Sequence, residues 1–322
     1  MLAVMSDPSV SAVDLRAAGD VDEIRVAMER DGYLPDEGLA TAVHLALQLR
    51  RPLLLEGEAG VGKTEVARSL ARLSGGELIR LQCYEGIDVA QAVYEWDYSR
   101  QLLHLRATET AATVGATGDL DVDSLEDELY TERFLVRRPL LRAVTTSTGP
   151  PPVLLIDEVD RADDEFEAFL LETLADYAVT VPELGTFTAS VPPIVVLTSN
   201  RTRDVHDALK RRCLYHWIDH PGFEREVAIV RRRAASVDES LARQVAAMTE
   251  RFRELGLYKP PGVAEAIDWA VALSTLGTDR LDFDAARATL GTVLKYREDQ
   301  ERVLDLGLGT MVGDAMQRAA VG

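Results

Sequence analysis

Cysteine is scarce in this chain of 322 residues, and long apolar runs are missing. Cys83 and Cys213 have no CxxC spacing and no histidine cluster nearby, which argues against a disulfide framework and a zinc site. No apolar run reaches the ~20 residues that a membrane helix needs. The opening MLAVMSDPSVSAVD lacks the charged and apolar regions of a signal peptide. We therefore expect a cytoplasmic, reduced setting and no transmembrane segment.

Basic residues are also few relative to acidic ones. The chain has 35 Lys and Arg against 54 Asp and Glu, a net charge of -19. This balance argues against a protein whose main task is to coat DNA, RNA or an anionic membrane, because those partners are polyanions. With 47% hydrophobic and 28% charged residues, the composition is that of a globular protein long enough for two domains.

Strand and helix signals alternate through the first two thirds of the chain. Apolar runs of strand length lie in RPLLLEG, VLLIDE and IVVLTSN, and a weaker one lies in ELIRLQC. Helical periodicity separates them over 39–49, 66–73 and 163–174, and VTVPELGTFTASV predicts a hairpin near 178–191. Strands that alternate with helices predict an α/β fold with a parallel sheet covered on both faces.

Beyond Pro221 and Gly222 the patterns predict helices only. A second helix is expected from Val263, and DFDAARATLGTVLKYREDQERVLDL predicts a third. The first helix, which precedes Val263, carries one apolar stripe formed by Leu241, Val245, Met248, Phe252 and Leu255. We expect three parts: an N-terminal extension at 1–32, an α/β domain at 33–221 and a helical domain at 222–322.

The segment GEAGVGKT matches the phosphate-loop pattern GxxxxGK[ST] and lies between a predicted strand and a predicted helix. Backbone N–H groups can wrap a polyanion there, because Gly57, Gly60 and Gly62 carry no Cβ atoms to obstruct it. Lys63 can reach the β- and γ-phosphates, and the Thr64 hydroxyl can ligate Mg²⁺. The motif predicts a site for a nucleoside triphosphate with Mg²⁺.

A second phosphate-related string, LSGGE, follows ten residues later and resembles the ABC-transporter signature LSGGQ. In ABC proteins that signature opens a helix, whereas here it closes the helix that the phosphate loop begins. Gly75 and Gly76 are expected to end this helix by adopting positive φ. We therefore interpret LSGGE as a helix terminus.

Polar residues follow two of the apolar strands. VLLIDE places Asp157 and Glu158 at a strand's carboxyl end, where parallel sheets bind ligands. Asp157 can hold Mg²⁺ through water, and Glu158 can orient and deprotonate an attacking water. IVVLTSN delivers Asn200 in the same way. The alternatives are an acidic pair that caps the next helix and an asparagine that forms a turn.

Three basic residues end DALKRRC, namely Lys210, Arg211 and Arg212. Cations at a helix C-terminus often only complement the helix dipole. Guanidinium groups also stabilise the charge that builds up during phosphoryl transfer, frequently from a neighbouring subunit. The residues alone leave both interpretations open.

Taken together and in this order, GEAGVGKT, VLLIDEVDRA, LTSN and DALKRRC resemble the AAA+ ATPases, and within them the MoxR family. GYLPDEGLATAVHLALQLRRPLLLEG is also MoxR-like, and LQCYEGIDVAQAVYEWDYSRQLL looks closest to the CoxD-like subgroup that accompanies carbon monoxide dehydrogenase and related molybdenum hydroxylases. The resemblance implies a P-loop AAA+ core with a parallel five-stranded sheet between helices and an all-α lid. It also implies an insert near 94–136, whose acidic DLDVDSLEDE favours a solvated charged face.

The resemblance also implies roles for individual residues. Glu158 would be the catalytic base and Asn200 the sensor 1 residue. Arg212 would be the arginine finger acting in trans, with Arg211 as its nearest competitor. Asp157 would hold Mg²⁺ together with Thr64. The expected nucleotide contacts are Gly57, Gly60, Val61, Gly62, Lys63, Thr64 and Glu65, with Tyr33 and Leu34 against the adenine. The chain departs from the family at KPPGVAEA, where relatives carry an arginine in the sensor 2 turn and Lys259 is a weak substitute.

The function that this resemblance implies is ATP hydrolysis by a homo-oligomeric ring, expected to be a hexamer. Such a ring would act as a chaperone that remodels a client metalloenzyme or assists its metal-cofactor maturation, together with a von Willebrand factor A-domain protein. Its cofactors would be ATP and Mg²⁺, and nucleic acid is not an expected partner. The alternatives are an AAA+ ATPase that acts on nucleic acid and a nucleotide-gated adaptor. A GTPase is disfavoured because no NKxD motif follows LTSN.

Overall fold

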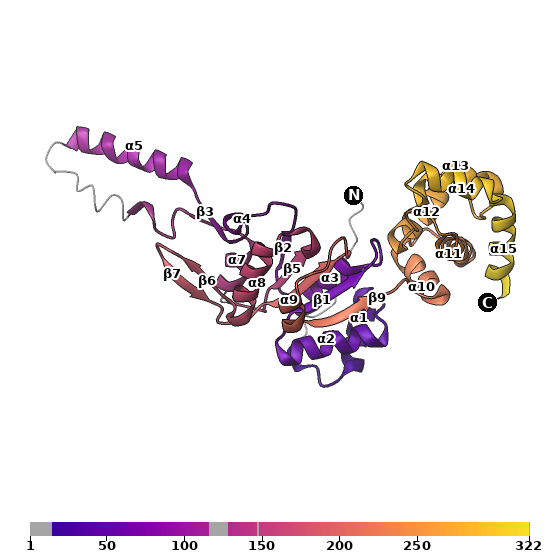
Figure 1. Cartoon of the computed structure of the whole chain (residues 1–322), viewed down its shortest axis with the longest axis horizontal. Helices are drawn as coiled ribbons and strands as arrows, with labels where there is room; N and C mark the ends of the chain where they lie inside the picture. The colour runs from indigo at the N-terminus through magenta and orange to yellow at the C-terminus, as the bar shows by residue number, and fades with distance from the viewer. Residues whose placement is uncertain (1–14, 116–127, 147, 322) are drawn as a thin grey trace. The chain divides into compact units, whose positions relative to one another are not determined.

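The computed structural model describes residues 15–115, 128–146 and 148–321 (Figure 1). Its contacts divide the chain into two compact units, and each is described by itself below. The core unit comprises the described residues of Met1–Ala17, Ala42–Leu54 and Leu70–Tyr215, and the lid unit those of Ala18–Thr41, Leu55–Ser69 and His216–Gly322. The domain boundaries expected at residues 32 and 221 stay a prediction. Both units contain segments of the first two expected parts, and the third part lies in the lid unit.

A five-stranded sheet has the strand order β2-β5-β8-β1-β9. Every residue of β1, β5 and β8 is buried, which explains their continuous apolar runs, because strands of a parallel sheet are covered on both faces. The edge strand β2 alternates buried and exposed residues and gave a weaker signal. The parallel α/β fold is confirmed. Its strands are β1 (Leu53–Gly57), β2 (Leu78–Gln82), β5 (Val153–Asp157), β8 (Ile194–Ser199) and β9 (Leu214–Ile218).

Helices α4, α7 and α8 pack with β2, β5 and β8 around the hydrophobic core of the core unit. Helix α8 begins where Asp163 accepts a hydrogen bond from the Phe166 amide, and it ends where Tyr177 adopts a left-handed conformation. The predicted helices at 39–49 and 163–174 are confirmed with small shifts of their ends. The bounds are α2 (Glu37–Leu49), α4 (Val89–Val93), α7 (Pro139–Thr145), α8 (Asp164–Asp176) and α9 (Asp207–Arg212), with short 3-10 turns at Leu15–Ala17 and Val159–Arg161.

Helix α3 (Lys63–Ser74) starts at the phosphate loop and ends at LSGGE, so the helix-terminus interpretation is confirmed. Gly75 has a φ of 67° and supplies the left-handed turn. The expectation of positive φ at Gly76 is wrong. A Cβ atom there would lie 2.0 Å from the carbonyl oxygen of Pro151, so Gly76 is needed for close backbone approach rather than for its φ.

Two small antiparallel sheets belong to the core unit. The predicted hairpin is confirmed as β6 (Ala178–Val181) and β7 (Gly185–Thr188). In the expected insert, β3 (Tyr94–Trp96) pairs with β4 (Leu135–Arg137), and the two flank α5 (Tyr98–Gly115). The acidic stretch at 119–128 lies outside the described residues except for its last residue, Glu128.

The lid unit contains α1 (Val21–Asp31), which was assigned only to an N-terminal extension. Asp20 caps its start by accepting a hydrogen bond from the Glu23 amide, and Gly32 ends it with a φ of 96°. Only Ile24 and Met28 are buried in this helix, so its apolar periodicity is too weak to be read from the sequence.

The C-terminal region is helical, as predicted, and is coloured orange to yellow in Figure 1. Four residues of the predicted stripe are buried in α11, whereas Leu255 lies beyond the helix and is partly buried. Phe252 stacks on the fully buried Trp269, with 5.9 Å between ring centroids. The single helix expected over 282–306 is wrong, because the chain is extended at Leu294 and Tyr296. The helices are α10 (Phe223–Arg233), α11 (Glu239–Arg253), α12 (Val263–Thr275), α13 (Phe283–Val293), α14 (Arg297–Asp305) and α15 (Leu308–Val321).

Candidate active site

The phosphate loop lies in the lid unit between β1 and α3. Gly60 and Gly62 have φ of 82° and 98°, which residues with a Cβ atom rarely adopt. At Gly57 the limit is steric, because a Cβ atom would lie 2.4 Å from the carbonyl oxygen of Ile218. Each of the three predicted glycines therefore sits where a larger residue would strain the loop. Val61 is buried beside them.

Lys63 is the first residue of α3, and its side chain turns back into the loop. Its Nζ donates hydrogen bonds to the carbonyl oxygens of Gly57 at 2.7 Å and Glu58 at 2.6 Å. Lys63 is only 7% exposed. Its ammonium group therefore lies inside the loop that is expected to bind the phosphates. The next residues, Thr64 and Glu65, form the first turn of the same helix, and Glu65 pairs with Arg233 of α10 at 3.3 Å.

Tyr33, expected against the adenine, packs beside the phosphate loop within the lid unit. Its ring lies 3.8 Å from the Cβ position of Gly62, and burial raises the pKa of its hydroxyl well above the usual range. The next residue, Leu34, is fixed by Arg225 of α10, whose Nη2 and Nε donate to its carbonyl oxygen at 2.7 and 3.1 Å. The structure thus places this segment against the loop that the motif predicts.

Asp36 anchors the same segment. Its Oδ2 accepts a hydrogen bond from Arg225 Nη1 at 3.2 Å, and its Oδ1 accepts one from the Leu39 amide at 2.7 Å. The side chain of His216 lies 3.5 Å from Oδ1. The neighbouring His216 side chain holds the pKa of Asp36 far below its usual range, although burial opposes that shift. Asp36, His216 and Arg225 were not predicted, since they are distant in sequence and match no motif.

The turn KPPGVAEA brings the start of α12 onto the phosphate loop. The Ala264 amide donates to the carbonyl oxygen of Gly60 at 3.2 Å, and a Cβ atom on Gly262 would lie 2.8 Å from the carbonyl oxygen of Ala59. Glu265 accepts a hydrogen bond from the Gly262 amide at 3.0 Å. Lys259 is exposed, and its amide donates to Asp299. The start of α12 therefore contacts the phosphate loop through backbone groups.

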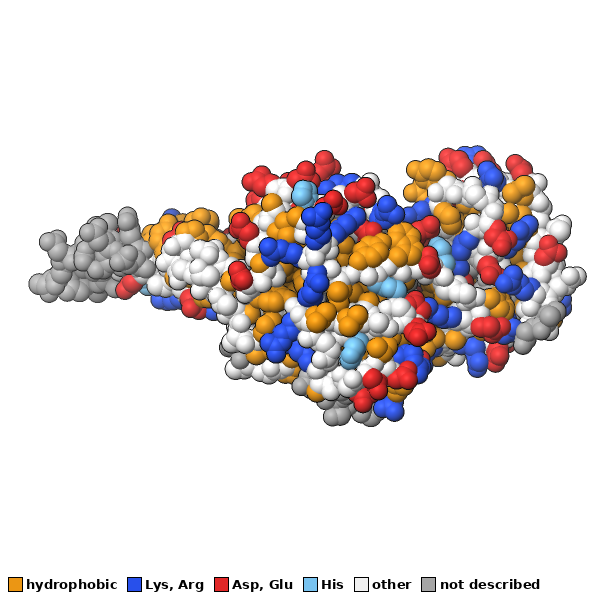
Figure 2. Space-filling model, turned by 60° about the horizontal axis from the view of Figure 1, so that its bottom comes forward, with side chains coloured by type: hydrophobic (Ala, Val, Ile, Leu, Met, Phe, Trp, Pro, Cys, Tyr) orange, Lys and Arg blue, Asp and Glu red, His pale blue; other side chains and the backbone are white. Residues whose placement is uncertain are grey.

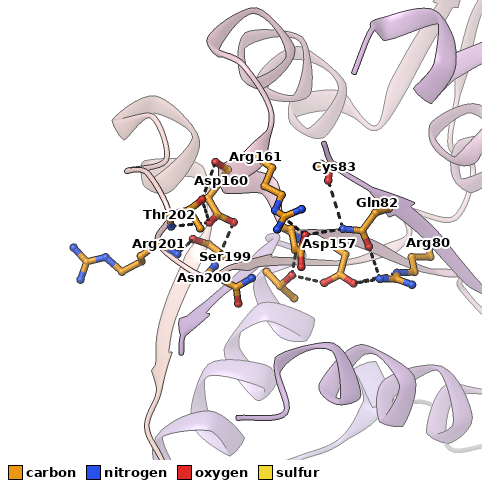
Figure 3. A network of polar contacts seen from close by, with 12 residues as sticks. Arg80, Gln82, Cys83, Asp157, Asp160, Arg161, Ser199, Asn200, Arg201 and Thr202 are labelled. Atoms are coloured by element: carbon orange, nitrogen blue, oxygen red, sulfur yellow. Dashed lines mark hydrogen bonds and ion pairs between the residues drawn. The ribbon is translucent and has the colours of Figure 1, made fainter. Parts of the chain in front are cut away.

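In the core unit, Asp157 ends β5 and is 4% exposed (Figure 3). Its Oδ2 pairs with Arg80 of β2 at 2.6 Å, and its Oδ1 accepts a hydrogen bond from the Thr198 hydroxyl at 2.5 Å. The same hydroxyl accepts a hydrogen bond from the Glu158 amide at 3.0 Å. Thr198 therefore bridges the two predicted carboxylate residues from the neighbouring strand β8.

Glu158 has a φ of 56°, a left-handed conformation that is rare for residues other than glycine. Its Oε2 accepts a hydrogen bond from Gln82 Nε2 at 3.1 Å and pairs with Arg161 Nε at 3.0 Å. Gln82 comes from the end of β2, where it lies in register with Asp157. Backbone strain of this kind is concentrated at functional sites.

Asn200 directly follows β8, and the loop after it is held by Asp160 (Figure 3). The carboxylate of Asp160 is 1% exposed and accepts hydrogen bonds from the amides of Asn200 at 3.2 Å and Thr202 at 2.9 Å. The Thr202 hydroxyl donates a third at 2.7 Å. The structure thus brings Asn200 to the end of the strand beside β5, as predicted.

Both finger candidates are exposed on α9 in the core unit. Arg212 donates from Nη1 to the carbonyl oxygen of Leu171 at 3.2 Å. Arg211 lies next to it in the last turn. Their exposure is compatible with action on a neighbouring subunit, and the choice between them stays open.

The two residues predicted to hold Mg²⁺ lie in different units, Thr64 in the lid unit and Asp157 in the core unit, and their joint role stays a prediction. In the part of the chain that the structure describes, no group of three or more His, Cys, Asp or Glu side chains could hold a metal ion. Mg²⁺ usually takes one or two protein oxygens and completes its shell with water and substrate phosphates. Thr64 carries a hydroxyl and Asp157 a carboxylate, which are each the kind of oxygen ligand that Mg²⁺ takes. The two cysteines are buried, and burial raises the pKa of Cys83 to about 12, so its thiol is not an activated nucleophile.

None of the described helices combines the length and the hydropathy that a membrane span requires. The chain is similar to solved structures of RuvB from Thermotoga maritima, a Holliday junction branch migration motor, with 15% identity over 78% of this chain and 66% of that one and a TM-score of 0.44. A proline-to-glycine variant of RuvB aligns over 92% of this chain and 84% of its own, with 14% identity and a TM-score of 0.46. The chain thus spans about two thirds of the length of the first RuvB structure. The family model for the AAA domain, dynein-related subfamily, matches residues 52–213, which is half of the chain. The protein therefore belongs to the dynein-related subfamily of AAA domain proteins.

Proposed function

We propose that this chain hydrolyses ATP with Glu158 as the general base. The observation that carries the proposal is the state of Glu158, which follows the buried Asp157 in a left-handed conformation and is held by Gln82 and Arg161. A solvated helix cap would need none of these restraints. A base that must meet one water molecule in one geometry does need them.

The other predicted residues take complementary roles in this proposal. The glycines and Lys63 of the phosphate loop bind the phosphates, while Thr64 and Asp157 hold Mg²⁺, which neutralises charge on the phosphates when bound. Glu158 accepts the proton of the attacking water, and Asn200 orients that water or the γ-phosphate. Tyr33 and Leu34 bind the adenine. Family membership supports the assignment of residues from both units to one nucleotide.

The arginine that completes the site comes from a neighbouring subunit in this proposal. Arg212 stabilises the charge that develops on the transferred phosphoryl group, and Arg211 is the alternative. The exposure of both side chains supports action in trans. The assembly is a ring, proposed to be hexameric, in which each subunit lends its finger to the next.

We further propose that the ring is a MoxR-type chaperone for a client metalloenzyme of the carbon monoxide dehydrogenase class, working with a von Willebrand factor A-domain protein. The support is the CoxD-like segment LQCYEGIDVAQAVYEWDYSRQLL and the net charge of -19. Acidic and basic side chains are interspersed over the visible face of the lid helices, at the right of Figure 2. A polyanion such as DNA binds better to a surface on which positive charges predominate.

The experiment uses Glu158→Gln as a trap. The variant is expected to bind ATP and barely turn it over, so that it retains its client for pull-down and mass spectrometry. Glu172→Gln, on the exposed face of α8, is the matched control and should behave as the parent does. If Glu158→Gln hydrolyses ATP at the parent rate, the assignment of the base is wrong. ATPase activity that DNA stimulates, with a steep salt dependence, would instead support a nucleic-acid motor.

A further inference from the structure

A single side chain, Arg51, contacts the carbonyl end of the helix that carries the finger candidates. Its Nη2 donates to the carbonyl oxygen of Arg211 at 2.6 Å, and its Nε donates to that of Arg212 at 3.0 Å. A third contact reaches the carbonyl oxygen of Cys213 at 3.3 Å. The last carbonyl groups of a helix have no partner within the helix, so an arginine placed there fixes the last turn.

The fold explains how Arg51 reaches this position from 160 residues away. Helix α2 ends at Leu49, Arg50 adopts a left-handed conformation with a φ of 51°, and the Arg51 amide donates back to Ala46 at 3.1 Å. This cap turns the chain into β1. The carbonyl oxygen of Pro52 then accepts a hydrogen bond from the Leu214 amide at 2.8 Å, so the start of β1 lies beside the end of α9.

Helix α9 also packs with α8, and Arg51 binds the carbonyl groups at the end of its last turn. Arg212 donates to Leu171 of α8 through one nitrogen at 3.2 Å, and its side chain is otherwise exposed. The helix has six residues, and two of its last three carry the finger candidates. A terminal turn of a short helix frays readily when its carbonyl groups lose their partners. Catalysis requires the guanidinium group to be placed within about 0.5 Å.

We propose that Arg51 is a positioning residue for the arginine finger. The inference rests on the proposed function, because it takes Arg211 or Arg212 as a finger that acts in trans. Arg51 lies six residues before Gly57 and two residues before β1, the strand that leads into its own phosphate loop. Arg51 therefore acts on the nucleotide site of the neighbouring subunit, although in sequence it lies close to the phosphate loop of its own subunit.

The alternative is that Arg51 merely stabilises β1 and so supports its own phosphate loop. The two roles predict loss of ATPase activity at the nucleotide sites of different subunits. Loss of a finger-positioning residue impairs the neighbour's site and leaves the variant's own site competent. Loss of support for β1 impairs the variant's own site, and no neighbour can restore it.

The experiment mixes subunits. Arg51→Met removes every side-chain donor and keeps the apolar stem, while Arg50→Met changes the exposed neighbouring arginine and serves as the control. Arg51→Met alone is expected to bind an ATP analogue as the parent does and to lose on the order of 100-fold in kcat, the cost of a finger misplaced by about 1 Å. Arg50→Met should keep the parent rate. Lys63→Ala supplies subunits with an intact finger and an inactive site, and mixed with Arg51→Met it should restore part of the activity at hybrid interfaces.

Three results would overturn the inference. Arg51→Met could hydrolyse ATP at the parent rate. It could bind the ATP analogue weakly. It could also gain no activity from Lys63→Ala subunits, while Arg212→Ala or Arg211→Ala gains activity in the same mixture. If neither finger variant gains, the proposed action in trans fails and this inference fails with it, which separates the two claims. Should Arg51→Met not fold, Arg51→Gln carries the same comparison.

Discussion

The Thr198 hydroxyl lies 2.5 Å from Asp157 Oδ1 and 3.0 Å from the Glu158 amide, so one side chain of β8 fixes both carboxylate residues at the end of β5. Thr198→Val keeps the shape and removes the hydroxyl. Two buried polar groups then lose their partner, at a cost of about 1–3 kcal/mol in stability. We expect kcat to fall on the order of 100-fold with a small change in KM. Thr198→Ser restores the hydroxyl and should recover most of the rate. Steady-state ATPase assays check this, and a Val variant with parent kcat would contradict it.

Arg225 gives a second prediction, about the lid unit. Arg225→Gln frees the carbonyl oxygen of Leu34 and weakens the anchor at Asp36, so the segment beside the phosphate loop loosens. KM for ATP should rise by about tenfold, equal to 1.4 kcal/mol, while kcat changes less.

The control for this prediction lies on the same helix. Arg231 pairs with Glu239 through side chains that are both more than half exposed, and such surface pairs contribute about 0–1 kcal/mol. Arg231→Gln should therefore leave KM unchanged. A pattern in which both variants raise KM equally would assign the effect to α10 as a whole rather than to the Leu34 contact.

The buried pair of Glu226 and Arg253 predicts a pH dependence of stability. Glu226 is fully buried and accepts two hydrogen bonds from Arg253, yet burial outweighs that partner and raises the pKa of Glu226 above its ordinary 4.5. The folded state then holds this proton more tightly than the unfolded state does. The resulting stability is fully present below pH 4.5 and is lost as the pH rises through the raised pKa.

Glu226→Gln removes this titration. Thermal unfolding between about pH 4 and pH 8 should show the parent's advantage over the variant shrinking as the pH rises. Growth of that advantage with pH would mean that Arg253 dominates and that the carboxylate is stabilised in the folded state.

Gly76 predicts a steric effect on the core unit. Its Cβ position lies 2.0 Å from the carbonyl oxygen of Pro151, so Gly76→Ala must displace backbone. Its unfolding free energy should fall by several kcal/mol, more than the ~1–3 kcal/mol of ordinary overpacking. Gly313 lies in α15, where a Cβ atom meets nothing within 4 Å. Gly313→Ala should be neutral or stabilising by up to about 1 kcal/mol. Equal melting temperatures for the two variants would contradict the close approach.

Local sequence patterns predicted the buried strands and the phosphate loop, because both depend on residues that are neighbours in the sequence. The buried strands follow from apolar runs, and the phosphate loop follows from glycines whose positive φ the structure shows. Asp157, Glu158 and Asn200 were predicted from their place after such strands. Their function as an active site stays a prediction until it is measured.

The features that the sequence did not predict depend on contacts between distant segments. Gln82 contacts Glu158 only because β2 and β5 pair in one register. The weak alternation of β2 did not allow this register to be predicted. The break between α13 and α14 contains no glycine or proline. It accompanies the buried Asp299, which accepts hydrogen bonds from the amides of Tyr258 and Lys259. Such tertiary contacts override helix propensity and leave no local signal.

The most direct test compares ATP turnover by the parent chain with that of Lys63→Ala and Glu158→Gln, one residue from each unit. If both units serve one nucleotide, the parent hydrolyses ATP and each variant falls at least about 100-fold, as expected when phosphate binding or the base is lost. Glu158→Gln should still bind ATP, whereas Lys63→Ala should bind it weakly. A parent chain that does not hydrolyse ATP, or either variant turning it over at the parent rate, would contradict the account.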